Sequence, residues 1–189
     1  MGRILVAGIS EIDPNKFNSP HIKTSTKDFT YLNKPNGCLW GSTFLPNGHY
    51  PSDWIRWVCG ENFHVDSYKE AISFTLKRNA RICTIYTVED YKNIMKKYSL
   101  INNVYYTLKE KMIDWDKLSH DFDAFHLTES AFWTMRMGSF DDNFVDDEGF
   151  QLKDFYSYDC ESWILFNLEC INKGSILNHN LNITSDCED

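Results

Sequence analysis

The chain has 189 residues, of which 42% are hydrophobic, and its 27 acidic and 19 basic side chains give a formal net charge of −8. This length and hydrophobic content are those of a globular domain with a sizeable core and exclude a disordered chain. Lysine and arginine form no strong basic face, which disfavours nucleic acid as the main partner without excluding it, and no window approaches the ~20 apolar residues of a membrane helix.

The first third of the chain is predicted to contain three strands and one helix. Short apolar or alternating runs predict the strands, and Pro and Gly mark the turns between them. The Ser52-Asp53 pair is typical of a helix N-terminus, and Trp54 and Trp57 then share one face of that helix at i, i+3 spacing. The predicted strands span residues 3–9, 21–26 and 38–44, and a turn spans residues 34–37.

The rest of the chain alternates irregularly between helices and strands. Asp66 or Ser67 is predicted to open a helix, and Thr87, followed by Glu89 and Asp90, is predicted to cap a helix that ends at Tyr98. A further helical stretch is expected to run through residue 109, and residues 137–150 read as an acidic loop. The remaining predicted strands span residues 80–86, 123–128 and 161–168.

Strands outnumber long helices, and the strict strand–helix alternation of a doubly wound fold is missing. This pattern predicts an α+β domain with a mixed or antiparallel sheet. No repeat or low-complexity linker divides the chain. We therefore expect a single domain over residues 1–189, with its core over about 20–170 and a flexible tail over about 175–189.

The cysteines are scattered, form no CxxC pair and follow no secretory signal. This pattern predicts reduced thiols and a cytoplasmic protein. Their spacing with the histidines matches no zinc motif, and the acidic run of residues 141–148 lacks the pattern of a calcium loop, so no metal is expected. The six cysteines are Cys38, Cys59, Cys83, Cys160, Cys170 and Cys187.

Polar residues beside the predicted strands are the candidates for a site. Glu161 comes directly before a hydrophobic strand, where its carboxylate could face a cleft and stabilise an oxocarbenium-like centre as a glycosidic bond breaks. His21 could bind a sugar hydroxyl, and Trp40 or Tyr31 could stack on a planar ring. On burial tendencies alone, Trp40 is more often a core residue, and His21 and Glu161 are ordinary polar groups at strand ends.

The order of these segments resembles that of the ADP-ribosyltransferase superfamily. An early His21, with Thr24 nearby, precedes a Lys-Pro-x-Gly-x-Leu-Trp-x-Ser segment that ends at Ser42, and an Asp-x-Glu pair, Asp159 and Glu161, precedes a late strand. The Lys-Pro segment is similar to one in small bacterial and phage proteins associated with that fold.

The resemblance implies a split, mostly antiparallel β-sandwich with peripheral helices that holds NAD as a co-substrate and needs no metal. It implies that Glu161 is catalytic, that Asp159 occupies the position that selects the acceptor, and that NAD contacts His21, Thr24, Tyr31, Trp40 and Ser42. Asp159 differs from the Gln or Glu that many arginine-modifying members carry there. The implied activity is transfer of ADP-ribose to a macromolecule, with a protein as the favoured acceptor, by a toxin, an effector or an anti-defence protein.

Two alternatives share this fold. The first is a non-catalytic protein that inhibits a partner by binding it through exposed aromatic residues, with Trp54 and Trp57 or Phe132 and Trp133 as the centre of the interface. The second is an NAD glycohydrolase, which uses the same site but transfers ADP-ribose to water. Asp123 and Glu129, which flank a predicted strand, are a weaker alternative pair of carboxylates.

Overall fold

The computed structural model describes residues 2–17, 34–102, 110–138, 141, 144–152, 154–155 and 157–183. The predicted strand at 21–26 and three of the proposed NAD contacts, His21, Thr24 and Tyr31, lie outside these residues. Five of the cysteines lie within them, and all five are buried and free of disulfides. No helix among the described residues is both long and apolar enough to cross a membrane.

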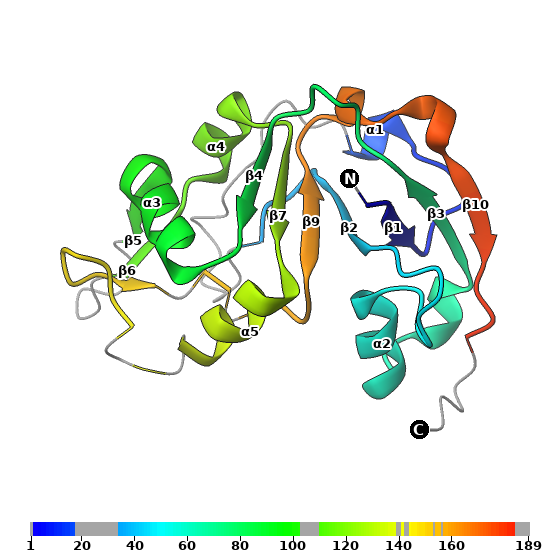
Figure 1. Ribbon diagram of the computed structural model, residues 1–189, viewed down its shortest axis with the longest axis horizontal. Helices are drawn as coiled ribbons and strands as arrows, with labels where there is room; N and C mark the ends of the chain where they lie inside the picture. Colours follow the sequence, from blue (N-terminus) through cyan, green and yellow to red (C-terminus); the bar gives the residue numbers. More distant parts are fainter. Residues whose placement is uncertain are drawn as a thin grey trace.

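The protein has the α+β architecture expected from the sequence, built on a seven-stranded, mostly antiparallel sheet with strand order β10-β3-β1-β2-β9-β7-β4 (Figure 1). Among the described strands of this sheet, only β4 and β7 pair in parallel, and a connection containing α3 and α4 joins them. Its strands are β1 (Ile4–Ala7), β2 (Leu39–Thr43), β3 (Glu70–Phe74), β4 (Ile82–Ile85), β7 (Ala124–Leu127), β9 (Ser162–Leu165) and β10 (Leu177–Asn180).

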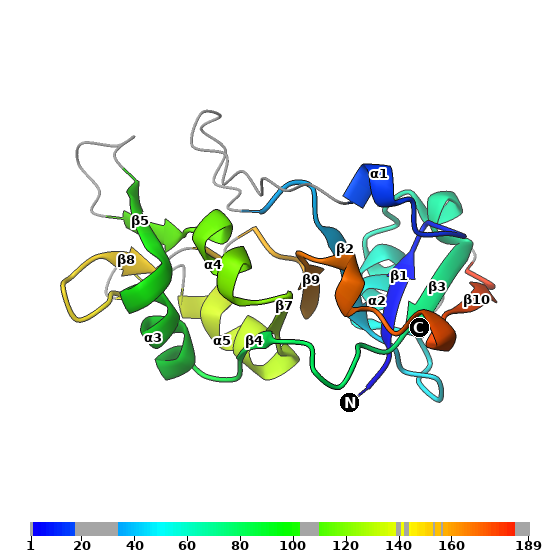
Figure 2. The same cartoon turned by 90° about the horizontal axis from the view of Figure 1, so that it is seen from above.

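A smaller three-stranded sheet lies beside α3, with strand order β5-β6-β8 (Figures 1 and 2). Its strands are β5 (Ser99–Asn102), β6 (Glu110–Ile113) and β8 (Gln151–Leu152). The helices are α1 (Pro14–Phe17), α2 (Asp53–Gly60), α3 (Val88–Tyr98), α4 (Trp115–Asp121) and α5 (Glu129–Gly138), and the 3-10 turns are Val65–Tyr68, Leu168–Cys170 and Lys173–Ser175.

Three of the sequence predictions are corrected by the fold. The helix expected from Asp66 or Ser67 is a 3-10 turn that leads into β3, and the helical stretch expected after α3 is strand β5 over its first four residues. Residues 177–180 of the expected flexible tail form the edge strand β10, which pairs with β3. In each case pairing with a neighbouring strand overrides the local preference of the sequence.

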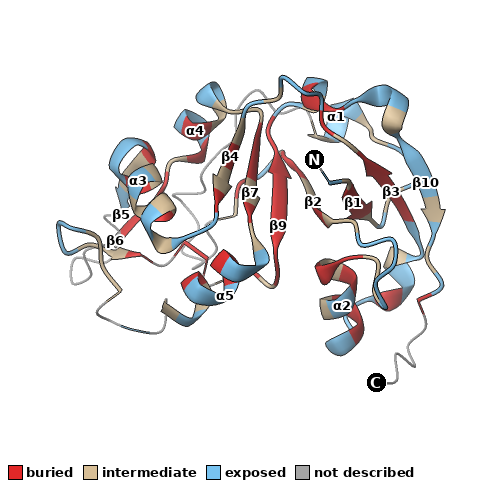
Figure 3. Ribbon diagram, in the orientation of Figure 1, coloured by how far each residue is buried: buried red, intermediate tan, exposed pale blue. Residues whose placement is uncertain are grey.

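Alternating side chains bury both faces of the large sheet. On β9, Ile164 packs into a cluster with α3, α4 and α5, whereas Trp163 and Leu165 pack into a second cluster on the opposite face. A third cluster packs Leu5 and Ala71 against α2. As a result, all four residues of β9 are buried in the middle of the sheet (Figure 3).

Candidate functional site

Glu161 lies where three strands of the large sheet meet. It directly precedes β9, whose first residues lie between α2 and α5 in Figure 1. The register pairs Gly41 of β2 with Trp163 of β9, so Thr43 at the end of β2 comes opposite Glu161. On the other side of β9, His126 of β7 also pairs with Trp163. The strand ends thus bring Thr43, Glu161 and His126 together.

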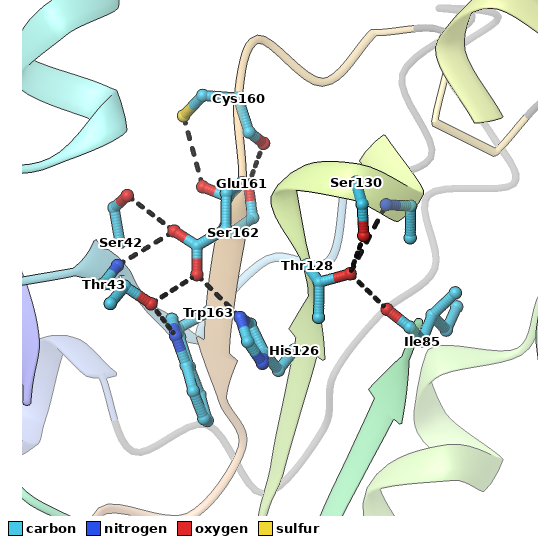
Figure 4. Close-up of polar contacts among 11 residues, drawn as sticks. Ser42, Thr43, Ile85, His126, Thr128, Ser130, Cys160, Glu161, Ser162 and Trp163 are labelled. Atoms are coloured by element: carbon cyan, nitrogen blue, oxygen red, sulfur yellow. Dashed lines mark hydrogen bonds and ion pairs between the residues drawn. The ribbon is translucent and has the colours of Figure 1, made fainter. Parts of the chain in front are cut away.

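The Glu161 carboxylate is almost fully buried, with 5% of the side chain exposed, and it accepts four hydrogen bonds. Oε2 accepts from the Ser42 hydroxyl at 2.7 Å and from the Thr43 backbone N–H at 2.9 Å. Oε1 accepts from the Thr43 hydroxyl at 2.7 Å and from Nε2 of His126 at 2.7 Å (Figure 4). A carboxylate offers about four lone-pair positions, so all of them are used.

These contacts keep Glu161 ionised. Burial by itself raises the pKa of a carboxyl group, but the hydrogen bonds from His126, Thr43 and Ser42 outweigh it and hold the pKa of Glu161 below its usual range. The result is a fixed negative charge in a site from which water is largely excluded. Such a charge is an effective stabiliser of a cation that develops nearby.

The Thr43 hydroxyl joins Glu161 to a pair of stacked rings. It accepts a hydrogen bond from the indole Nε1 of Trp163 at 3.0 Å while donating its own proton to Glu161. The indole and the imidazole of His126 are nearly parallel, with ring centroids 3.9 Å apart and an interplanar angle of 10°. Hydrogen bonds and the ring contact therefore connect Glu161, Thr43, Trp163 and His126 in a closed loop.

A second carboxylate, Asp53, lies near Glu161. Asp53 is the first residue of α2, is buried, and forms a 3.1 Å ion pair with Arg56, which also bridges to Glu129 on α5 at 3.1 Å. Burial and the negative charges of Glu129 and Glu161 raise the pKa of Asp53, although Arg56 opposes them. The two neighbouring carboxyl groups, Asp53 and Glu161, therefore have pKa values shifted in opposite directions.

Asp159 and Trp40 lie beside Tyr158 and are not part of the hydrogen-bond network of Glu161 described above. Asp159 forms a 3.2 Å ion pair with Lys34, whose ammonium lies 5.6 Å from the centre of the Tyr158 ring. The half-buried Trp40 ring is 5.5 Å from the same tyrosine and packs against the core cluster of α3, α4 and α5. Because side chains alternate along β2, Trp40 and Thr43 point to opposite faces of the sheet.

Of the predicted site residues that the structure describes, only Ser42 and Glu161 are in contact. His126, Thr43 and Trp163 were not predicted from the sequence. His126 had a recognisable signal, because a histidine alternates there with the apolar residues of a buried strand. Thr43 and Trp163 had none, because a threonine and a tryptophan are ordinary strand residues.

No known family, characterised protein or solved structure shows a significant match to the chain. Within the described residues, no three histidine, cysteine or acidic side chains are grouped so that they could hold a metal ion.

Proposed function

We propose that the protein cleaves the bond between nicotinamide and ribose in NAD and transfers the ADP-ribose to a macromolecule, with a protein as the acceptor. The observation that carries this proposal is the ionised, buried carboxylate of Glu161. Glycosidic bonds break through oxocarbenium-like transition states, and a preorganised anion lowers the energy of such a state more than that of the neutral sugar. We also propose that the fold of this protein resembles that of the ADP-ribosyltransferases.

The contacts of Ser42 and Thr43 also support a catalytic role for the carboxylate. Three of the four hydrogen bonds to Glu161 come from these consecutive residues, so the carboxylate cannot turn away when substrate binds. Preorganisation of this kind avoids the reorganisation that water would require around a developing charge. In this proposal Ser42 acts by fixing Glu161. Asp159, which lies two residues before Glu161 and pairs with Lys34, contributes to acceptor choice.

The same carboxylate also supports a second candidate, a non-catalytic protein that binds a partner. All four acceptor positions of Glu161 are satisfied within the chain, as they would be in a purely structural network. Of the aromatic residues expected at such an interface, Phe132 is buried in the core and Trp133 is 50% exposed. Trp133 and Met137 on α5, the latter 64% exposed, would then contribute to an interface. An NAD glycohydrolase, which transfers ADP-ribose to water, would use the proposed catalytic site unchanged.

Incubation with NAD separates these candidates. Release of nicotinamide, measured by chromatography, indicates cleavage, and intact-mass spectrometry of candidate targets shows whether they gain an ADP-ribosyl unit. We expect both signals from the wild-type protein and both to be much weaker from Glu161→Gln. Nicotinamide release without target modification would indicate a glycohydrolase. A stable complex with a target, without any covalent change, would favour the binding protein.

NAD binding is measured separately from cleavage of the nicotinamide–ribose bond. NAD should quench tryptophan fluorescence and raise the melting temperature, because a ligand that binds only the folded state stabilises it by mass action. If saturating NAD changes neither signal, the proposed function is wrong.

A further inference from the structure

Two contacts hold the imidazole ring of His126 in a single orientation, one to its Nε2 atom and one to the face of the ring. Its Nε2 lies 2.7 Å from Oε1 of Glu161, and its ring stacks on Trp163 at 3.9 Å. The indole is itself fixed by the Thr43 hydroxyl. An imidazole with this much support has little freedom to rotate.

The contact with Glu161 also fixes which nitrogen of His126 carries the proton. An ionised carboxylate can only accept hydrogen bonds, so Nε2 must be the donor. In the neutral imidazole this leaves Nδ1 with a free lone pair. None of the residues that the structure describes forms a hydrogen bond with Nδ1.

His126 is the more accessible partner of this pair. Its side chain is 15% exposed, compared with 5% for Glu161, whose acceptor positions are all filled. A substrate that approaches the network can therefore reach the imidazole more easily than the carboxylate.

We infer that His126 is a catalytic general base that takes the proton of the attacking nucleophile through Nδ1, while Glu161 also positions the imidazole. This inference rests on the proposed function. In the step, the bond between C1′ of the ribose and the nicotinamide nitrogen breaks, and nicotinamide leaves with the electron pair. The oxygen or nitrogen of the acceptor forms the new bond to C1′, and its proton moves to Nδ1 of His126. Water as the acceptor follows the same route.

The test is His126→Gln, with NAD as the probe and water as the acceptor. The amide nitrogen of glutamine can occupy the place of Nε2 and donate to Glu161, but glutamine has no group that replaces the Nδ1 lone pair. His120→Gln is the matched control, because His120 is exposed on α4 and its side chain has no role in the site. Nicotinamide release, NAD affinity from fluorescence and thermal melting are measured for wild type and both variants.

We expect His126→Gln to lower the rate of nicotinamide release by roughly 10²–10⁴-fold, the range for loss of a general base, with NAD affinity and melting temperature close to wild type. His120→Gln should behave as wild type. If His126→Gln does not fold, His126→Ala with added imidazole replaces it, and restored release then supports the base.

The possible results test the role of His126 separately from the proposed cleavage of NAD. A folded His126→Gln protein that releases nicotinamide within twofold of wild type, while Glu161→Gln is inactive, would overturn the role of His126 and leave the proposed function intact. A folded His126→Ala protein that imidazole does not rescue would count against the base in the same way. A wild-type protein that releases no nicotinamide overturns both.

Discussion

Gly41 on β2 packs directly against Ile4 on β1. A β-carbon at Gly41 would lie 2.7 Å from Cγ2 of Ile4 and 2.8 Å from the carbonyl oxygen of Leu5. Real β-carbons do not approach other atoms so closely, and one of these neighbours is rigid backbone. The small residue is needed for this close strand packing, and it directly precedes Ser42 and Thr43, which hold Glu161.

Gly41→Ala should therefore destabilise the protein by roughly 1–3 kcal/mol, the usual cost of overpacking, and should also lower activity by displacing Ser42. Urea unfolding followed by circular dichroism measures the first effect, and nicotinamide release the second. Gly60→Ala is the control, because a β-carbon there would have no heavy atom within 4 Å apart from its chain neighbours and the backbone of its own helix. Equal stability of the two variants would contradict the close packing of β1 and β2.

Glu161→Gln should lower both stability and activity. The amide has only one acceptor oxygen and brings two donors of its own, so some of the buried donors that now bond to the carboxylate lose their partner. The expected loss of stability is about 1–3 kcal/mol, and the expected loss of rate is roughly 10²–10³-fold with a much smaller change in NAD affinity.

The matched control is Glu169→Gln, because the Glu169 side chain is 72% exposed in a surface pair with Lys173. Its stability and activity should remain at the wild-type level. A folded and fully active Glu161→Gln protein would rule out the transferase mechanism.

The lowered pKa of Glu161 predicts how stability depends on pH. The folded state binds a proton at Glu161 less readily than the unfolded state, in which the pKa is close to the reference value of 4.5. The stabilising effect of the charge is therefore complete above that value and is lost as pH falls through the lower pKa of the folded state. The difference in unfolding free energy between wild type and Glu161→Gln should be constant near neutral pH and shrink in acid. A difference that grew as pH fell would contradict this.

Thr87→Ala should destabilise the protein without affecting the site. The Thr87 hydroxyl accepts a hydrogen bond from the Asp90 backbone N–H, and the Asp90 carboxylate accepts one from the Thr87 N–H in return. Loss of such a cap costs about 1 kcal/mol. Thr134→Ala on α5, where the hydroxyl donates to the Ser130 carbonyl of its own helix, should cost less in thermal melting. Nicotinamide release should be unchanged in both variants.

Two helices were predicted from the sequence where they lie, and two others, α4 and α5, were not predicted. The helix expected from Thr87 to Tyr98 is α3, with the expected cap, and the helix expected at Ser52-Asp53 is α2, capped by Ser52. Strand β3 was missed because its Glu and Ala are typical of helices, and only pairing with β1 and β10 makes it a strand. Such pairing is not visible in a local stretch of sequence.

The same limit applies to the site. Ser42 and Glu161 were both selected from the sequence, and they are in contact. Asp159 and Trp40 were selected with them but lie around Tyr158, because neighbouring residues of an extended chain point in different directions. His126 joins the site through the order of the strands, which places β7 next to β9, and no spacing in the sequence indicates that order.

The position of β9 has a consequence for when the site comes into existence. This strand joins the two halves of the large sheet, β10-β3-β1-β2 on one side and β7-β4 on the other, yet it is the next-to-last strand of that sheet to be synthesised. Until it inserts, Ser42 and Thr43 on one half and His126 on the other have no common neighbour. A growing chain on the ribosome therefore has no assembled site until the step that unites its sheet, and its proposed activity appears only when its fold is nearly complete.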